Sequence, residues 1–85
     1  MRIDKFLKIS RILKRRSVGK EACDSNIVAV NGKNVKPSYK VKVGDVVEVF
    51  FASGTLKFVV KLIKESVKKE EVSSLYDIIT ESENE

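Results

Sequence analysis

The chain has 85 residues, the size of one small domain, so we expect a single folded unit without a separate catalytic domain. It carries 17 Lys and Arg residues against 12 Asp and Glu residues, a formal net charge of +5 that favours an anionic partner. Histidine is absent and Cys23 is the one cysteine, which excludes histidine-based triads, internal disulfides and thiolate zinc sites.

Two helices are predicted at the start of the chain. The first residues repeat apolar side chains at helical spacing, which predicts an amphipathic helix that ends or bends around Ser10–Ile12. A basic connection, Lys14-Arg15-Arg16, follows it. Ser17 then fits the N-cap of a short second helix that runs from about Val18 to Ser25.

A small antiparallel sheet is predicted next. Asn31-Gly32 is typical of a type I′ turn, which needs positive φ at both central residues, so Ile27–Val30 and Lys33–Val35 should form a hairpin. A strand at Val46–Phe51, which we expect to be largely buried, could pair antiparallel with a further strand at Leu56–Ile63.

The last segment is predicted as a helix. Val72, Leu75, Tyr76 and Ile79 recur at helical spacing before the acidic tail Glu81–Glu85. This segment could close the small core or dock a protein partner. The element order predicts an α+β fold, with two N-terminal helices packed on a small antiparallel β-sheet and a short C-terminal helix.

The positive charge is concentrated in the N-terminal half, because residues 1–42 carry a net charge of +9 and residues 43–85 a net charge of −4. Cations this dense repel one another, which indicates a polyanionic partner, although a solvated helix face is the alternative explanation. Nucleic acid is favoured over a membrane because arginine binds phosphate through two parallel hydrogen bonds. We call eight of these side chains the cationic cluster: Arg2, Lys5, Lys8, Arg11, Lys14, Arg15, Arg16 and Lys20.

Separate blocks of sequence over about residues 1–50 carry a resemblance to a known family. They are Arg2–Leu7, Ser10-Arg11, Lys14–Ser17, Lys20–Ala22, Val28–Lys33, Lys36–Ser38 and Val43–Asp45. In this order the blocks resemble the alpha-L RNA-binding motif, the domain named after small-subunit ribosomal protein four. The added strand and the ending, with Lys68–Glu71 and then Leu75–Asp77, extend the resemblance. The whole chain is similar to the bacterial ribosome-associated quality-control P-site factor family, which is related to the heat-shock RNA-binding protein family.

The resemblance implies a function on the ribosome. It implies binding to the large subunit with its rRNA and a stalled peptidyl-tRNA, stabilisation of P-site tRNA, and support of C-terminal alanine tailing. The implied protein partner is a quality-control factor homologous to the nuclear export mediator factor. A domain over residues 1–64 would bind RNA, and residues 65–85 would form the C-terminal helix and tail.

The resemblance also implies roles for single residues. Arg2 and Arg16 match RNA-contacting arginines, and Asp4 matches a supporting acidic position that would pair with a cation one or two turns on, Lys8 or Arg11, or simply stabilise the first turn of the helix. Asn31 would support the hairpin near RNA, although the turn alone also explains it. The candidate RNA-binding residues are Arg2, Lys5, Lys8, Arg11, Lys14, Arg15, Arg16, Lys20 and Lys33.

Four phenylalanines lie in apolar patterns that predict core positions: Phe6, Phe50, Phe51 and Phe58. Few aromatic rings are then left to stack on bases, so we expect the protein to recognise RNA by its shape and its phosphates. A stand-alone rRNA-binding chaperone or ribosome-biogenesis factor would need the same chemistry and stays open. Catalysis is disfavoured, and no cofactor or metal is expected. We expect a cytoplasmic protein that is a monomer. We expect no membrane segment, because the first eight residues already contain three cations and no uncharged stretch exceeds eight residues.

Overall fold

The computed structural model describes residues 1–83, with the side chains of residues 1–79. Within that range the chain forms two α-helices, a five-stranded antiparallel sheet and one 3-10 helix, which confirms the α+β fold. The elements are α1 Ile3–Ile9, α2 Arg16–Asp24, β1 Val28–Val30, β2 Lys33–Asn34, β3 Val46–Phe51, β4 Gly54–Val60, the 3-10 helix η1 Lys69–Ser74, and β5 Tyr76–Glu83.

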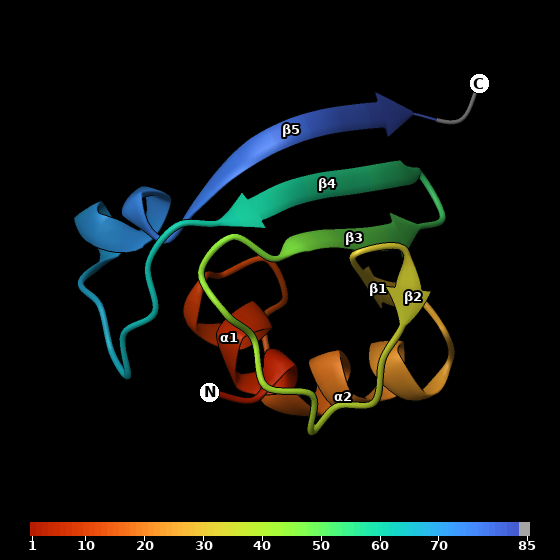
Figure 1. Cartoon of the computed structure of the whole chain (residues 1–85), viewed down its shortest axis with the longest axis horizontal. Coiled ribbons are helices and arrows are strands. Elements are labelled where there is room, and N and C mark those ends of the chain that lie inside the picture. The colour runs from red at the N-terminus through yellow and green to blue at the C-terminus, as the bar shows by residue number, and fades with distance from the viewer. Residues whose placement is uncertain (84–85) are drawn as a thin grey trace.

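The helices lie together on one side of the sheet (Figure 1). The strand order is β2-β1-β3-β4-β5, so β3 is central and β5 forms one edge. Alternate residues of β3 and β4, such as Val47 and its partner Phe58, are fully buried in the same core as α1. Glu48 and Lys57 are paired in register on the other face and stay partly exposed. The expectation that the strand from Val46 is largely buried was therefore wrong, because only one of its faces is covered.

Aromatic packing joins the helices to the sheet. The rings of Phe6 and Phe58 stack with centroids 6.3 Å apart, and Tyr76 tilts against Phe58 at 5.3 Å. Core positions were wrongly expected for Phe50 and Phe51, which are 40% and 37% exposed. Phe50 follows the alternation to the uncovered face, and Phe51 ends the strand opposite Gly54, which has no side chain to pack against it.

The hairpin confirms the Asn31-Gly32 prediction, since these two residues have φ values of 52° and 85°. The first helix ends at Ile9, as expected. The second begins at Arg16, earlier than expected, and Ser17 is not its N-cap. The cap position belongs to Arg15, whose carbonyl oxygen accepts hydrogen bonds from the backbone N–H groups of Val18 and Gly19.

The C-terminal segment departs most from the prediction. Val72 and Leu75 are buried, as the helical spacing implied, but they belong to η1 and the residue after it. From Tyr76 the chain is a strand that pairs with β4, so the expected helix through Ile79 was wrong. The open edge of β4 offers backbone hydrogen bonds, and the β-branched run Ile78-Ile79-Thr80 favours a strand. Of the acidic tail, residues 84–85 lie outside the described residues.

None of the helices within residues 1–83 combines the length and the apolar character needed to cross a membrane.

Replacing Leu75 by Ala should lower the free energy of unfolding by about 2–5 kcal/mol, because this fully buried side chain packs under the edge of the sheet. The matched change Ile79→Ala, at a half-exposed position of β5, should cost less than about 1 kcal/mol. Urea denaturation followed by circular dichroism measures both values. Equal losses in the two variants would contradict the burial described for Leu75.

Candidate nucleic-acid interface

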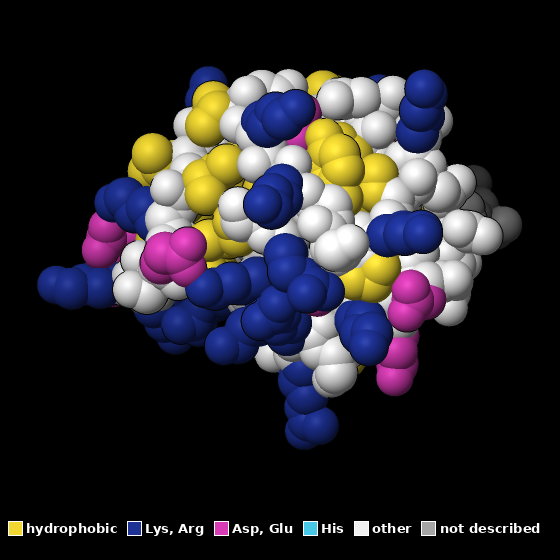
Figure 2. Space-filling view, turned by 60° about the horizontal axis from the view of Figure 1, so that its bottom comes forward, with side chains coloured by type: hydrophobic (Ala, Val, Ile, Leu, Met, Phe, Trp, Pro, Cys, Tyr) yellow, Lys and Arg dark blue, Asp and Glu magenta, His cyan; other side chains and the backbone are white. Residues whose placement is uncertain are grey.

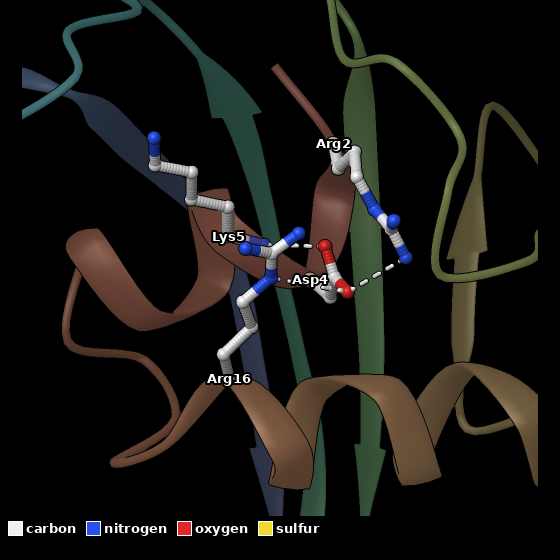
Figure 3. A network of polar contacts seen from close by, with 4 residues as sticks. All are labelled: Arg2, Asp4, Lys5 and Arg16. Carbon is white, nitrogen blue, oxygen red and sulfur yellow. Dashed lines mark hydrogen bonds and ion pairs between the residues drawn. The ribbon is translucent and has the colours of Figure 1, made fainter.

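A buried carboxylate lies at the centre of the cationic cluster. Asp4 is only 2% exposed, and its Oδ2 atom accepts a hydrogen bond from Nη2 of Arg2 at 3.1 Å and lies 3.5 Å from Nε of Arg16 (Figure 3). Its other oxygen, Oδ1, accepts the backbone N–H of Lys5 at 2.8 Å. Both oxygens therefore have partners, which a buried charge requires.

The two arginines are fixed at one end and exposed at the other. Their side chains are 43% and 49% exposed, so each guanidinium contacts Asp4 and still has N–H groups directed to solvent. We call Arg2 and Arg16 the arginine pair. A guanidinium held in one orientation loses less entropy when it binds a phosphate, so the pair is preorganised for an anion.

The expected partners of Asp4 were wrong. The sequence suggested Lys8 or Arg11, one or two turns further on, whereas the structure ends α1 at Ile9, before Arg11, and uses Arg2 just before α1 and Arg16 at the start of α2. Asp4 lies on the buried side of α1, so cations on the exposed side cannot reach it. The other explanation, stabilisation of the first turn, agrees with the hydrogen bond from the Lys5 backbone.

Gly19 lets the two helices approach each other at this site. A Cβ atom at Gly19 would lie 3.2 Å from the carbonyl oxygen of Asp4 and 3.3 Å from its Cα atom. Glycine thus permits the close packing that brings Arg16 to Asp4. Cys23, further along α2, is buried, and burial with the nearby carboxylates of Asp4 and Asp24 raises the pKa of its thiol to about 11. The thiol is therefore neutral and contributes packing to the helix interface.

The segment between β2 and β3 holds the N-terminus in place. The backbone N–H of Ile3 donates to the carbonyl of Tyr39 at 2.7 Å, and that of Val41 donates to the carbonyl of Met1 at 2.9 Å. Arg2 thus forms an isolated antiparallel β-bridge with Lys40, so its backbone is held in place as well as its side chain.

A second buried acid, Asp45, organises that segment and was missed by the sequence interpretation. It accepts hydrogen bonds from the Tyr39 hydroxyl at 2.9 Å, the Asn31 amide at 3.1 Å and the backbone N–H of Lys42 at 2.9 Å. The hydrogen bond to Asp45 raises the pKa of Tyr39. The sequence signal for Asp45 was the position of this acid, directly after Gly44 and before a predicted strand.

Asn31 has a structural explanation. Its side chain donates to Asp45 and accepts the backbone N–H of Val46 at 3.0 Å, so it ties the hairpin turn to the start of β3. Lys33 is exposed on β2, the edge strand of the same hairpin.

The remaining predicted cations lie on the helices and the turn between them. Lys and Arg side chains gather on the face where α1 and α2 come forward in Figure 2. Lys5 is half-buried and pairs with Glu65, whose pKa is lowered by this hydrogen bond and by the positive charge of Lys5. The exposed members of the cluster are Arg2, Lys8, Arg11, Lys14, Arg15, Arg16 and Lys20.

No group of three or more His, Cys, Asp or Glu side chains is arranged to hold a metal ion within the part of the chain that the structure describes.

Gly19→Ala should lower the free energy of unfolding by about 1 kcal/mol. Crowding of the new methyl group against the backbone of Asp4 destabilises the fold by roughly 1–3 kcal/mol, and the better helix propensity of alanine stabilises it by only about 1 kcal/mol. Ser17→Ala, at an exposed position of α2, is the matched control and should stay within about 0.5 kcal/mol of the wild type. Chemical denaturation measures both. A Gly19→Ala variant more stable than the wild type would contradict the close helix contact.

Comparison with known proteins adds independent information about this surface. The S4 domain family matches residues 1–47, which include α1, α2 and the hairpin. The chain is 46% identical over 82 residues to the RQC P-site tRNA stabilizing factor of Streptococcus pneumoniae, covering 96% of this chain and 93% of that protein. It is 42% identical over 81 residues to the protein of the same name from Bacillus subtilis, covering 95% and 94%.

The fold is also similar to a solved structure. Heat shock protein 15 of Vibrio cholerae, described as trimeric, superposes with a TM-score of 0.86 and 25% identity over 92% of this chain and 80% of that one. The sequence and structural matches span nearly the whole length described above. The chain therefore belongs to the S4 domain family and, within it, to the family of RQC P-site tRNA stabilizing factors.

Proposed function

We propose that this protein stabilises P-site tRNA on the large ribosomal subunit and so acts in ribosome quality control. The observation that carries the proposal is the arginine pair, two half-exposed guanidinium groups held by one buried carboxylate inside a dense cationic cluster. The near full-length similarity to proteins named for P-site tRNA stabilisation supports this choice of RNA.

The contact that the geometry favours is with phosphate. Arg2 and Arg16 stay about half exposed while they contact Asp4. Lys8, Arg11, Lys14, Arg15 and Lys20 are further exposed cations on the two helices and the turn between them. Lys and Arg side chains gather on this helical face in Figure 2. Such a surface positions an RNA backbone by charge and shape. Lys5 joins this set once its pairing with Glu65 is exchanged for a phosphate, and Lys33 on the hairpin adds a contact at the edge of the sheet.

We further infer how the chain is divided and which partners it has. Residues 1–64 supply the RNA-binding surface, and residues 65–85 are the C-terminal part, in which η1 and β5 follow β4. The protein acts without catalysis, as a cytoplasmic monomer, beside a quality-control factor homologous to the nuclear export mediator factor. Its action supports C-terminal alanine tailing of the stalled nascent chain.

A second candidate is favoured by the similarity to heat shock protein 15. A stand-alone rRNA-binding chaperone or ribosome-biogenesis factor would use the same surface. Imaging the particles that co-purify with the tagged protein decides between them, because the first proposal requires large subunits that hold peptidyl-tRNA. Recovery of assembling particles without tRNA would support the second candidate and contradict the first.

Binding should depend steeply on salt. If about six to eight phosphates are neutralised, affinity for ribosomal RNA falls on the order of a thousandfold between about 50 and 200 mM salt. Arg16→Glu should weaken binding at every salt concentration and reduce the slope of log affinity against log salt, whereas Lys69→Glu, the same charge change at an exposed position of η1, should leave the slope nearly unchanged. Filter binding across a salt series measures these slopes. A flat response, or equal effects of the two variants, would contradict the surface.

Asp4→Asn separates orientation from total charge. The substitution removes a negative charge near the cluster, so attraction alone predicts tighter RNA binding. Because Asp4 orients the arginine pair, we expect affinity to fall about fivefold to tenfold instead. Glu21→Gln changes the net charge equally at an exposed position of α2 and should tighten binding by less than about threefold. Tighter binding by both variants would show that Asp4 has no orienting role.

A further inference from the structure

A cleft of about 470 Å³ adjoins the cationic cluster, and three cations of that cluster line it. It lies between the turn that follows α1 and the segment 61–68 that leads from β4 to η1. Ile9, Leu13 and Val67 are the apolar side chains of its lining, and we call them the apolar floor. Three cations, Lys8, Arg11 and Lys14, stand along one side of it.

The turn that shapes the cleft has an uncommon backbone conformation. Arg11 has a φ of 61°, a left-handed conformation that residues other than glycine rarely adopt. Hydrogen bonds from its own N–H to the carbonyl of Lys8 and from the N–H of Leu13 to the carbonyl of Leu7 hold the turn. The turn buries Leu13 while Arg11 and Lys14 stay exposed at the mouth. Backbone strain of this kind gathers at functional sites.

The opposite wall is tied to the helix that carries the arginine pair. Glu65 forms an ion pair with Lys5, the residue next to Asp4 on α1. Lys5 points away from Arg2 on the same short stretch of helix (Figure 3). Adjacent residues of α1, Asp4 and Lys5, therefore connect the arginine pair to the wall of the cleft, which places both within reach of one bound RNA.

The size and chemistry of the cleft restrict its occupant. Its volume lies within the range of small-ligand pockets, which is large enough for a nucleotide. Three cations against one carboxylate favour an anion at the mouth, and the apolar floor favours a flat, poorly hydrated group inside. A nucleotide combines these two properties, because its base has apolar faces and its phosphate is charged.

We propose that the cleft receives one unpaired nucleotide of the bound RNA, with its base on Ile9, Leu13 and Val67 and its phosphate against Lys8, Arg11 and Lys14. The inference rests on the proposed RNA-binding function and deepens it. Recognition at this surface then depends on an unpaired base at a set distance from the RNA backbone that the arginine pair contacts, as well as on shape and phosphate.

The first test compares two RNA hairpins that differ by one nucleotide. One has a fully paired stem, and the other carries a single-nucleotide bulge with 2-aminopurine at that position. The wild-type protein should bind the bulged hairpin about tenfold more tightly, in keeping with the usual contribution of one base packed on a protein surface. The fluorescence of 2-aminopurine should change on binding, because the base moves from solvent to the apolar floor.

A cleft-blocking variant locates the effect. Ser66 is exposed and lines the cleft, so the indole of Ser66→Trp should fill the cleft. This variant should bind the bulged and the paired hairpin with about equal affinity. Affinity for the paired hairpin should stay at the wild-type level, because the arginine pair is untouched. Ser73→Trp, at an exposed position of η1, adds the same side chain away from the cleft and should keep the tenfold preference.

The outcomes separate this inference from the proposed function. Equal wild-type affinity for both hairpins, with the salt dependence intact, would overturn the nucleotide cleft and leave RNA binding standing. A preference that survives in Ser66→Trp would overturn the location. The wild-type comparison decides the inference even if Ser66→Trp fails to fold, and binding to neither hairpin would count against both proposals.

Discussion

The buried carboxylate of Asp4 is the constraint on which the functional surface depends. A charge removed from water is tolerated only when its oxygens are occupied, and here the occupants are the very arginines that face outward. Folding and anion recognition are therefore coupled. The close contact at Gly19 and the bridge between Arg2 and Lys40 bring both arginines to the same carboxylate.

Asp45 is a second buried acid whose oxygens are occupied, in the segment that leads to β3. It gathers hydrogen bonds from Tyr39, Asn31 and the Lys42 backbone, and so fixes a segment without regular secondary structure. That segment in turn anchors the N-terminal residues on which Arg2 lies. Two buried acids, each with partners both nearby and more than ten residues away in the sequence, thus hold the surface in one shape with few residues of core.

The sequence predicts the parts of the fold that local chemistry decides. Asn31-Gly32 specifies the hairpin turn, and the loss of apolar spacing after Ser10 marks the end of α1. It could not specify the partners of Asp4, which are set by the packing of α2 on α1 and not by spacing along one helix. Helical spacing at Val72–Ile79 was overridden by the free edge of β4, because backbone pairing along an open strand outweighs a weak local propensity. The cleft beside Arg11 likewise depends on segment 61–68, distant in sequence.

The uneven placement of charge also has a kinetic consequence. Cations gather on the helical face in Figure 2, whereas on the face of the sheet away from the helices an acid, Glu48, stands in register with a base, Lys57. The molecule is therefore an electric dipole as well as a cation. In the field of a polyanion a dipole experiences a torque, which turns the helical face toward RNA before any contact forms. Fewer encounters are then wasted in the wrong orientation, so the fold contributes to the association rate as well as to the strength of the final complex.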